Sequence, residues 1–157
     1  TLLNERFGGT VRAGKHDSDG LACALEFRSA ARGRAWSDDP TDIPDLRPLN
    51  DGPWSSNQAR TAAILPLLVA LDDWVEWSPA RQRAWTVRVT MDTIRHLVSE
   101  LPGLSDQLRS RCHAVATLGE AAAGAAAAVG RPGEAANAVL RRACRIWIDA
   151  AREEVAA

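Results

Sequence analysis

Four closely spaced prolines limit what the first third of this chain can fold into. Residues 34–53 contain Pro40, Pro44, Pro48 and Pro53. Because proline lacks a backbone N–H and clashes with the preceding turn, this stretch cannot form one continuous helix. It predicts a long irregular connection with a single helical turn over residues 45–50. Connections of this length inside a compact domain are often functional.

After residue 54 the apolar residues recur at helical spacing. Four helices are predicted there, over residues 55–72, 78–100, 106–129 and 134–154. Ser55 with Gln58 predicts a capping box, and Ser78-Pro79 predicts an N-cap followed by proline at the first helical position. Pro66 lies inside the first of these helices and predicts a kink or break near Ile64.

The residues before the prolines predict an arm and one further helix. Paired glycines in residues 1–15 favour a turn, so this arm is expected to be irregular or to hold a short strand. A helix is predicted over residues 21–32, closed by Gly33 in the left-handed conformation. On that helix Cys23, Glu26 and Phe27 would share one face. The Glu26 carboxylate is therefore expected to be partly buried and to need a partner.

Together these patterns predict an all-α fold, a bundle of about five helices with an irregular N-terminal arm and a long polar proline-rich loop. We expect a single helical domain over residues 1–157. Its parts are the arm (1–15), a polar signature segment (16–54) and the helical bundle (55–157).

Charge and cysteine usage narrow the class of protein. Nineteen basic and twenty acidic residues leave a net charge of -1, which argues against a general nucleic-acid binder. No apolar run reaches the roughly eighteen residues of a membrane span. Cys23, Cys112 and Cys144 are widely separated and form no CxxC pair, so reduced thiols in a soluble cytoplasmic protein are expected.

The signature segment carries side chains that could do chemistry. An imidazole, a thiol and carboxylates suit a transition metal such as zinc, with His16, Cys23 and Glu26 as ligands and Asp17 and Asp38 nearby. Alternatively, Cys23 would be a nucleophile, His16 its base, and Asp17 or Glu26 the orienting group. The structural interpretation is that His16 and Asp17 cap a helix and Cys23 is an inert core thiol.

A second polar group lies among the prolines and comprises Arg47, Asn50 and Asp51, with Asp38 before them. The planar guanidinium of Arg47 matches a carboxylate such as Glu26 or Asp38. The preferred interpretation is a buried polar network that fixes the proline-rich loop onto the helix over residues 21–32. The alternative is a carboxylate or phosphate ligand held by Arg47.

The order of these residues resembles a group of uncharacterised proteins from actinobacteria and their phages. The matching elements are His16-Asp17, Cys23-x-x-Glu26, Gly33, Trp36-Ser37-Asp38-Asp39-Pro40, Arg47 and Asn50-Asp51. The resemblance covers about residues 16–70 and implies a bacterial or phage source, but it transfers no activity. The segment between Pro40 and Arg47 is shorter here and lacks the cysteine often present there, which weakens the metal hypothesis.

We therefore expect a small accessory or protein-interaction domain, phage-linked, that acts with a protein partner or as a homo-oligomer. Enzymatic activity, a cofactor, and a membrane or nucleic-acid partner are not expected. The alternative is a metal-binding protein or hydrolase-like enzyme centred on His16, Asp17, Cys23, Glu26 and Asp38.

Overall fold

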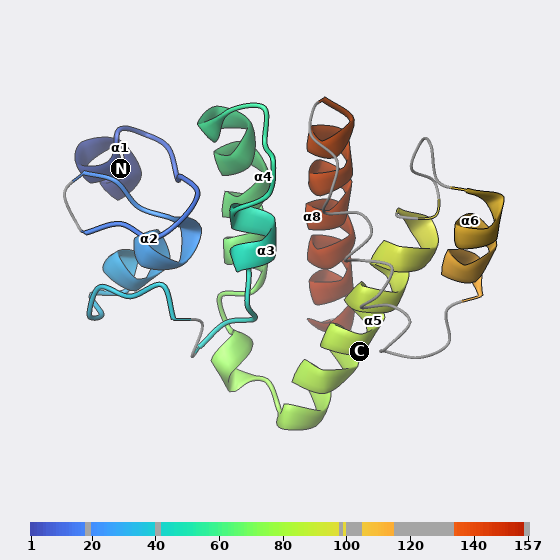
Figure 1. The fold of residues 1–157 in the computed structure, drawn as a ribbon. Coiled ribbons are helices and arrows are strands. Elements are labelled where there is room, and N and C mark those ends of the chain that lie inside the picture. Colours follow the sequence, from blue (N-terminus) through green and yellow to red (C-terminus); the bar gives the residue numbers. More distant parts are fainter. Residues whose placement is uncertain (18–19, 40–41, 98, 100–104, 115–133, 156–157) are drawn as a thin grey trace. The chain divides into compact units, whose positions relative to one another are not determined.

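The computed structural model describes residues 1–17, 20–39, 42–97, 99, 105–114 and 134–155 (Figure 1). Within these ranges the chain is helical and holds no strand, so the all-α prediction is confirmed. None of the described helices is long and apolar enough to cross a membrane. The contacts group into two compact units, Thr1–Glu76 and Trp77–Ala157. The single-domain organisation stays a prediction.

The first unit is built from short helices around one longer helix. These helices are α1 (Leu2–Phe7), α2 (Ala24–Ala31), α3 (Arg47–Asn50), α4 (Asn57–Ala70) and the 3-10 turn η1 (Trp74–Glu76). α4 packs against both α2 and α3. The expected helical turn after the prolines is therefore present as α3, and α4 is the element on which the unit is assembled.

The N-terminal arm is less irregular than expected, because α1 occupies its first half. Leu3 and Phe7 lie four residues apart on one face of α1, and both are buried. They form an apolar cluster with Val11 and Ala22, against which Trp36 packs. No strand forms at Val11, whose backbone N–H instead donates to a side chain of α4.

Two predicted helix starts are wrong, by three residues at α2 and by two at α4. α2 begins at Ala24, because Cys23 takes the N-cap position with extended backbone. α4 begins after Ser56, whose Oγ accepts from the Ala59 N–H at 3.0 Å, so Ser56 and not Ser55 is the N-cap. At the other end of α2, Gly33 has a φ of +65°, as predicted for a left-handed stop.

α4 continues through Pro66 without the break expected near Ile64. Proline at this position leaves the carbonyl of Ala62 without its intrahelical partner. Ala62 and Pro66 are both exposed, so water can bond that carbonyl and the helix is not interrupted.

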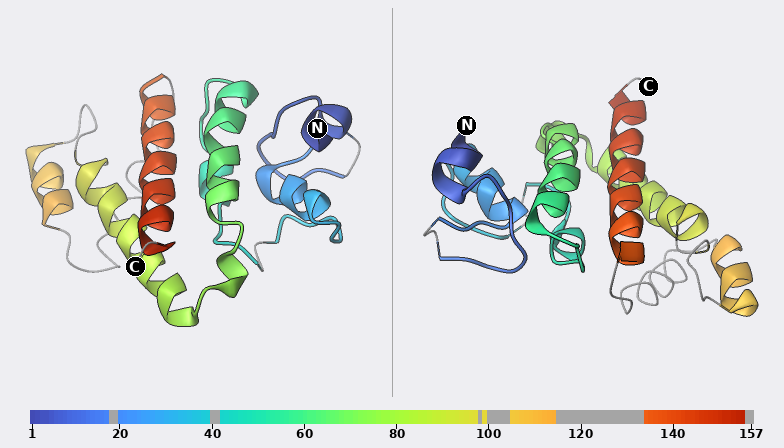
Figure 2. Two further views of the ribbon diagram at one scale, coloured as in Figure 1. Left: turned by 180° about the vertical axis from the view of Figure 1, so that it is seen from behind. Right: turned by 90° about the horizontal axis from the view of Figure 1, so that it is seen from above.

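The second unit contains α5 (Pro79–His96), α6 (Asp106–His113) and α8 (Glu134–Val155). α5 and α8 lie side by side in every view (Figures 1 and 2), and α5 also contacts α6. The predicted start of α5 is confirmed, since Ser78 Oγ accepts from the Arg81 N–H and Pro79 is the first helical residue. The alanine-rich part of the helix predicted over residues 106–129 lies outside the described residues.

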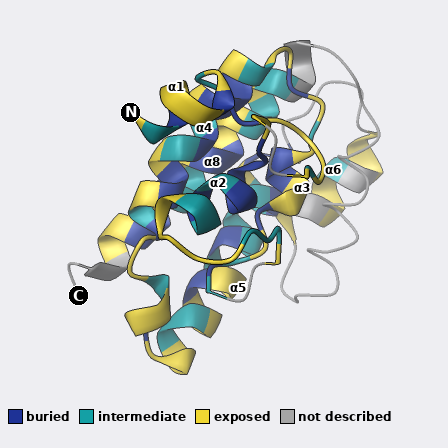
Figure 3. Ribbon diagram, turned by 90° about the vertical axis from the view of Figure 1, so that its left-hand side faces the viewer, coloured by how far each residue is buried: buried dark blue, intermediate teal, exposed yellow. Residues whose placement is uncertain are grey.

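Tryptophans hold α5 against α8. Buried and exposed residues alternate along the helices (Figure 3), and Trp85 is 1% exposed. Its ring meets those of Trp77 and Trp147 edge to face, with centroids 6.4 and 5.6 Å away. The Trp147 indole N–H donates to Thr93 Oγ1 at 3.0 Å. The tryptophans near residues 74–85 thus include core residues of the second unit.

Replacing Trp85 by alanine should destabilise the protein by about 3–5 kcal/mol, because it removes a large, fully packed ring. The change is measured by urea unfolding followed by circular dichroism. Val87→Ala, on the same helix but 47% exposed, is the control and should change stability by less than about 0.5 kcal/mol. Equal losses in the two variants would contradict a core centred on Trp85.

Candidate functional site

Glu26 has no exposed surface, and three groups surround its carboxylate. Oε1 accepts from the His16 backbone N–H at 2.7 Å, and Oε2 accepts from the Cys23 backbone N–H at 2.7 Å. The His16 Nδ1 lies 3.0 Å from Oε2 and donates to it when it carries a proton. A buried carboxylate is strongly destabilising unless its oxygens are hydrogen-bonded. These contacts therefore explain how Glu26 can be buried.

Cys23 takes part in the site through its backbone and its cap position. Its Sγ accepts from the Glu26 N–H at 3.4 Å, which completes a reciprocal capping box with the Glu26 side chain. Cys23 thus precedes the helix and does not share a helical face with Phe27 as expected. Burial, reinforced by the negative charge of Glu26, raises the pKa of the Cys23 thiol to about 12. The thiol stays protonated near neutral pH, which disfavours a nucleophile.

Asn50 connects three separate stretches of the first unit. Its Oδ1 accepts from the Ala24 N–H at 3.1 Å, and its Nδ2 donates to the Arg12 carbonyl at 2.8 Å and to Asp51 Oδ1 at 2.7 Å. Its own carbonyl accepts from Arg60 Nε on α4 at 2.6 Å. Asn50 is 1% exposed, and its amide makes a bond at each of its polar atoms. It therefore holds α2, α4 and the N-terminal arm together.

Further bonds extend the arrangement to neighbouring loops. Asp51 Oδ1 also accepts from the Gly14 N–H at 2.8 Å, and Gly14 has a φ of +78°, a conformation that favours glycine. The Trp36 indole N–H donates to the His16 carbonyl at 2.8 Å. We call the residues whose side chains make these bonds the polar network, namely His16, Cys23, Glu26, Trp36, Asn50, Asp51 and Arg60.

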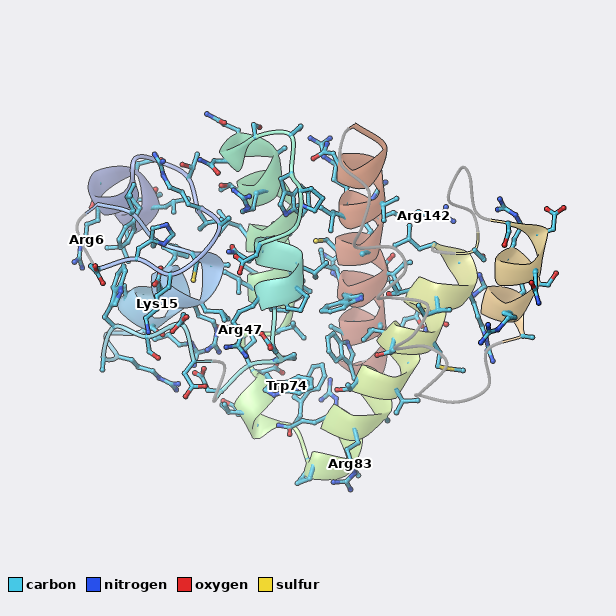
Figure 4. All side chains as sticks on the ribbon, viewed as in Figure 1. Arg6, Lys15, Arg47, Trp74, Arg83 and Arg142 are labelled. Carbon is cyan, nitrogen blue, oxygen red and sulfur yellow. The ribbon has the colours of Figure 1, made fainter. Side chains whose placement is uncertain are left out.

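Arg47 lies outside the polar network and does not pair with Glu26 or Asp38. Its Nε and Nη2 each lie 2.8 Å from one oxygen of Asp45, and Asp45 Oδ1 also accepts from the Arg47 N–H. Asp45 is only two residues away, so this fork forms locally. The Arg47 guanidinium lowers the pKa of the Asp45 carboxyl. Arg47 is half exposed at the surface of the first unit (Figure 4).

Two predicted site residues do not take part in the bonds around Glu26. Asp17 is exposed, and Asp38 pairs with Lys15, whose Nζ lies 3.5 Å from its Oδ1. The expected cluster of five is thus reduced to His16, Cys23 and Glu26. Among the described residues, no group of three or more His, Cys, Asp or Glu side chains is placed to hold a metal ion. The zinc alternative stays a prediction.

Arg60 is the network residue that the sequence interpretation missed. Its side chain is 6% exposed, and burial lowers the pKa of its guanidinium while Asp51 opposes that shift. The sequence does contain a signal for the burial of Arg60, because Arg60 is the only charged residue of α4. A lone charge at the start of an apolar helix indicates a buried partner.

No protein-family model, curated protein or solved structure matches this chain.

Glu26→Gln should destabilise the protein by about 1–3 kcal/mol, because an amide N–H₂ would face N–H donors now bonded to carboxylate oxygens. Arg47→Gln changes an exposed side chain and should stay within about 0.5 kcal/mol of the parent chain. Chemical denaturation followed by circular dichroism gives both values. A Glu26→Gln protein as stable as the Arg47→Gln control would contradict a structural role for Glu26.

Cys23 and Cys144 are buried, and burial raises the pKa of each thiol to about 12. In a chain carrying Cys112→Ser, neither thiol should react with iodoacetamide at about pH 8 in the folded state, because only the thiolate is nucleophilic. Both should react after unfolding in urea, which mass spectrometry detects. Rapid labelling of Cys23 in the folded chain would show a reactive thiol and support the nucleophile alternative.

Proposed function

We propose that this chain is a helical protein-interaction domain that self-associates through α4, and that the polar network is the framework holding that helix. The observation that carries the proposal is Val69, which is 76% exposed on a helix with no polar side chain between residues 62 and 71. Isolated apolar residues are common on protein surfaces, so an exposed Val69 indicates an interface only if its neighbours on the helix surface are also apolar.

The exposed side of α4 is a continuous apolar stripe. Ile64 and Leu67 are buried against the first unit, whereas Ala62, Pro66 and Val69 are exposed. The exposed positions are spaced by four and three residues, which places them on one helical face. A helix that is apolar on all sides is normally covered on all sides. A partner helix would supply the missing cover.

A second copy of the chain suits this stripe. In a two-fold symmetric dimer the same surface patch meets itself, so the patch must be self-complementary. The stripe consists of small or medium apolar side chains and carries no charge that would repel its own copy. Such side chains allow two helices to approach closely.

The polar network, together with Thr61, sets which face of α4 is turned outward. Arg60 Nε donates to the Asn50 carbonyl at 2.6 Å, and Thr61 Oγ1 accepts from the Val11 N–H at 2.9 Å. These bonds hold the first turn of α4 to α3 and to the N-terminal arm. With the helix fixed at these points, the stripe through Val69 faces away from the first unit.

The metal-binding or hydrolase alternative has less support. The oxygens of Glu26 are occupied by His16 and Cys23, and the Cys23 thiol is protonated near neutral pH. Asp17 is exposed, and Asp38 pairs with Lys15. A closed hydrogen-bonded group of this kind is typical of a structural role.

Val69→Glu should weaken self-association at least roughly tenfold, because it places a charge in an apolar interface. Sedimentation velocity across a concentration series measures the effect. The matched control is Val87→Glu, an exposed valine of α5, which should self-associate like the parent chain. A parent chain that remains monomeric at every concentration, or equal weakening in both variants, would overturn the proposal.

A further inference from the structure

The Arg28 guanidinium on α2 is buried with only part of its hydrogen-bonding capacity used. Its side chain is 6% exposed, and its Nη1 lies 2.6 Å from Asp42 Oδ2. Its Nε and Nη2 are shielded from solvent and have no hydrogen-bond partner. A buried charged donor left without an acceptor is strongly unfavourable, so an unpaired group of this kind calls for a physical explanation.

The two unused atoms form one edge of the guanidinium. Nε and Nη2 donate in parallel, and this edge matches two oxygens of a carboxylate or phosphate. Arg47 shows the same edge in use, since its Nε and Nη2 each lie 2.8 Å from an oxygen of Asp45. Arg28 therefore has the same pair of donor atoms that Arg47 uses to bind Asp45, but no anion is bonded to them.

Among the described residues that pair around Arg28, the positive side chains outnumber the negative ones. Arg34 Nη1 shares Asp42 Oδ2 with Arg28, and Arg32 Nη2 lies 2.5 Å from Asp72 Oδ1. Three guanidinium groups thus face two carboxylates, which leaves one positive charge in excess. Burial and the charge of Arg32 lower the pKa of Arg28, and Asp72 only partly opposes them. A further negative charge would stabilise the cluster.

We propose that the Nε–Nη2 edge of Arg28 binds an oxoanion, the carboxylate or phosphate group of a small molecule. Arg34, which is 45% exposed, shares the Asp42 carboxylate with Arg28. The anion would accept both vacant donors and neutralise the excess charge. This site is separate from the α4 stripe and does not depend on self-association.

Thermal unfolding of the full chain in sodium phosphate, sodium acetate and sodium chloride at equal ionic strength tests the proposal. The melting temperature should rise with the concentration of phosphate or acetate beyond the rise in chloride. Phosphate and acetate also stabilise folded proteins without binding, because they are excluded from the protein surface. A response to phosphate alone or to acetate alone therefore identifies the bound group only where the Arg28→Lys variant loses it.

Variants assign the effect to Arg28. Arg28→Lys keeps the charge but removes the parallel donors, so it should weaken the anion response by roughly tenfold or more. Arg47→Lys makes the same change at a residue whose donors are already bonded, and it should respond like the parent chain. If Arg28→Lys does not fold, Arg34→Gln takes its place and should weaken the response severalfold.

The same titration contains the results that would overturn the proposal. An equal response to all three salts would show that no oxoanion is bound and that water serves the two donors. An Arg28→Lys protein, or its Arg34→Gln substitute, that responds like the parent chain would place the anion elsewhere.

Discussion

The buried carboxylate of Glu26 is the constraint on which the first unit depends. It has no exposed surface, so its oxygens must be bonded by the protein itself. The donors come from His16, ten residues earlier, and from Cys23 at the start of the helix that carries Glu26. Burial of the Glu26 carboxylate therefore requires the loop before α2, the N-cap of α2 and His16 to take up their positions at the same time.

Asn50 links the start of α2 to the rest of the first unit. Its amide reaches the start of α2 and the N-terminal arm, and its carbonyl reaches Arg60 on α4. Members of such a network are cooperative, because loss of one partner leaves other buried groups unsatisfied. The polar segment that first suggests an active site is thus explained by its structural role, which is to hold α4 in place within the first unit.

Some signals contained in a few neighbouring residues were predicted correctly, whereas the partners of the buried polar side chains were not. Ser78-Pro79 and Gly33 act through their own backbone geometry, so the start of α5 and the stop after α2 followed from sequence. The need of Glu26 for a partner was also predicted. The identity of that partner was not, because backbone N–H groups supply two of its bonds and every residue type except proline carries one. Arg47 bonded the nearby Asp45 instead of a distant carboxylate.

Amide hydrogen exchange at His16 and Cys23 tests the central claim most directly. Both N–H groups donate to Glu26, so the account predicts that they exchange only when the first unit unfolds. The Arg47 N–H, which donates to the exposed Asp45, is the internal reference and should exchange much faster. If the His16 and Cys23 amides exchange as fast as that of Arg47, the network is open in solution and the account is wrong.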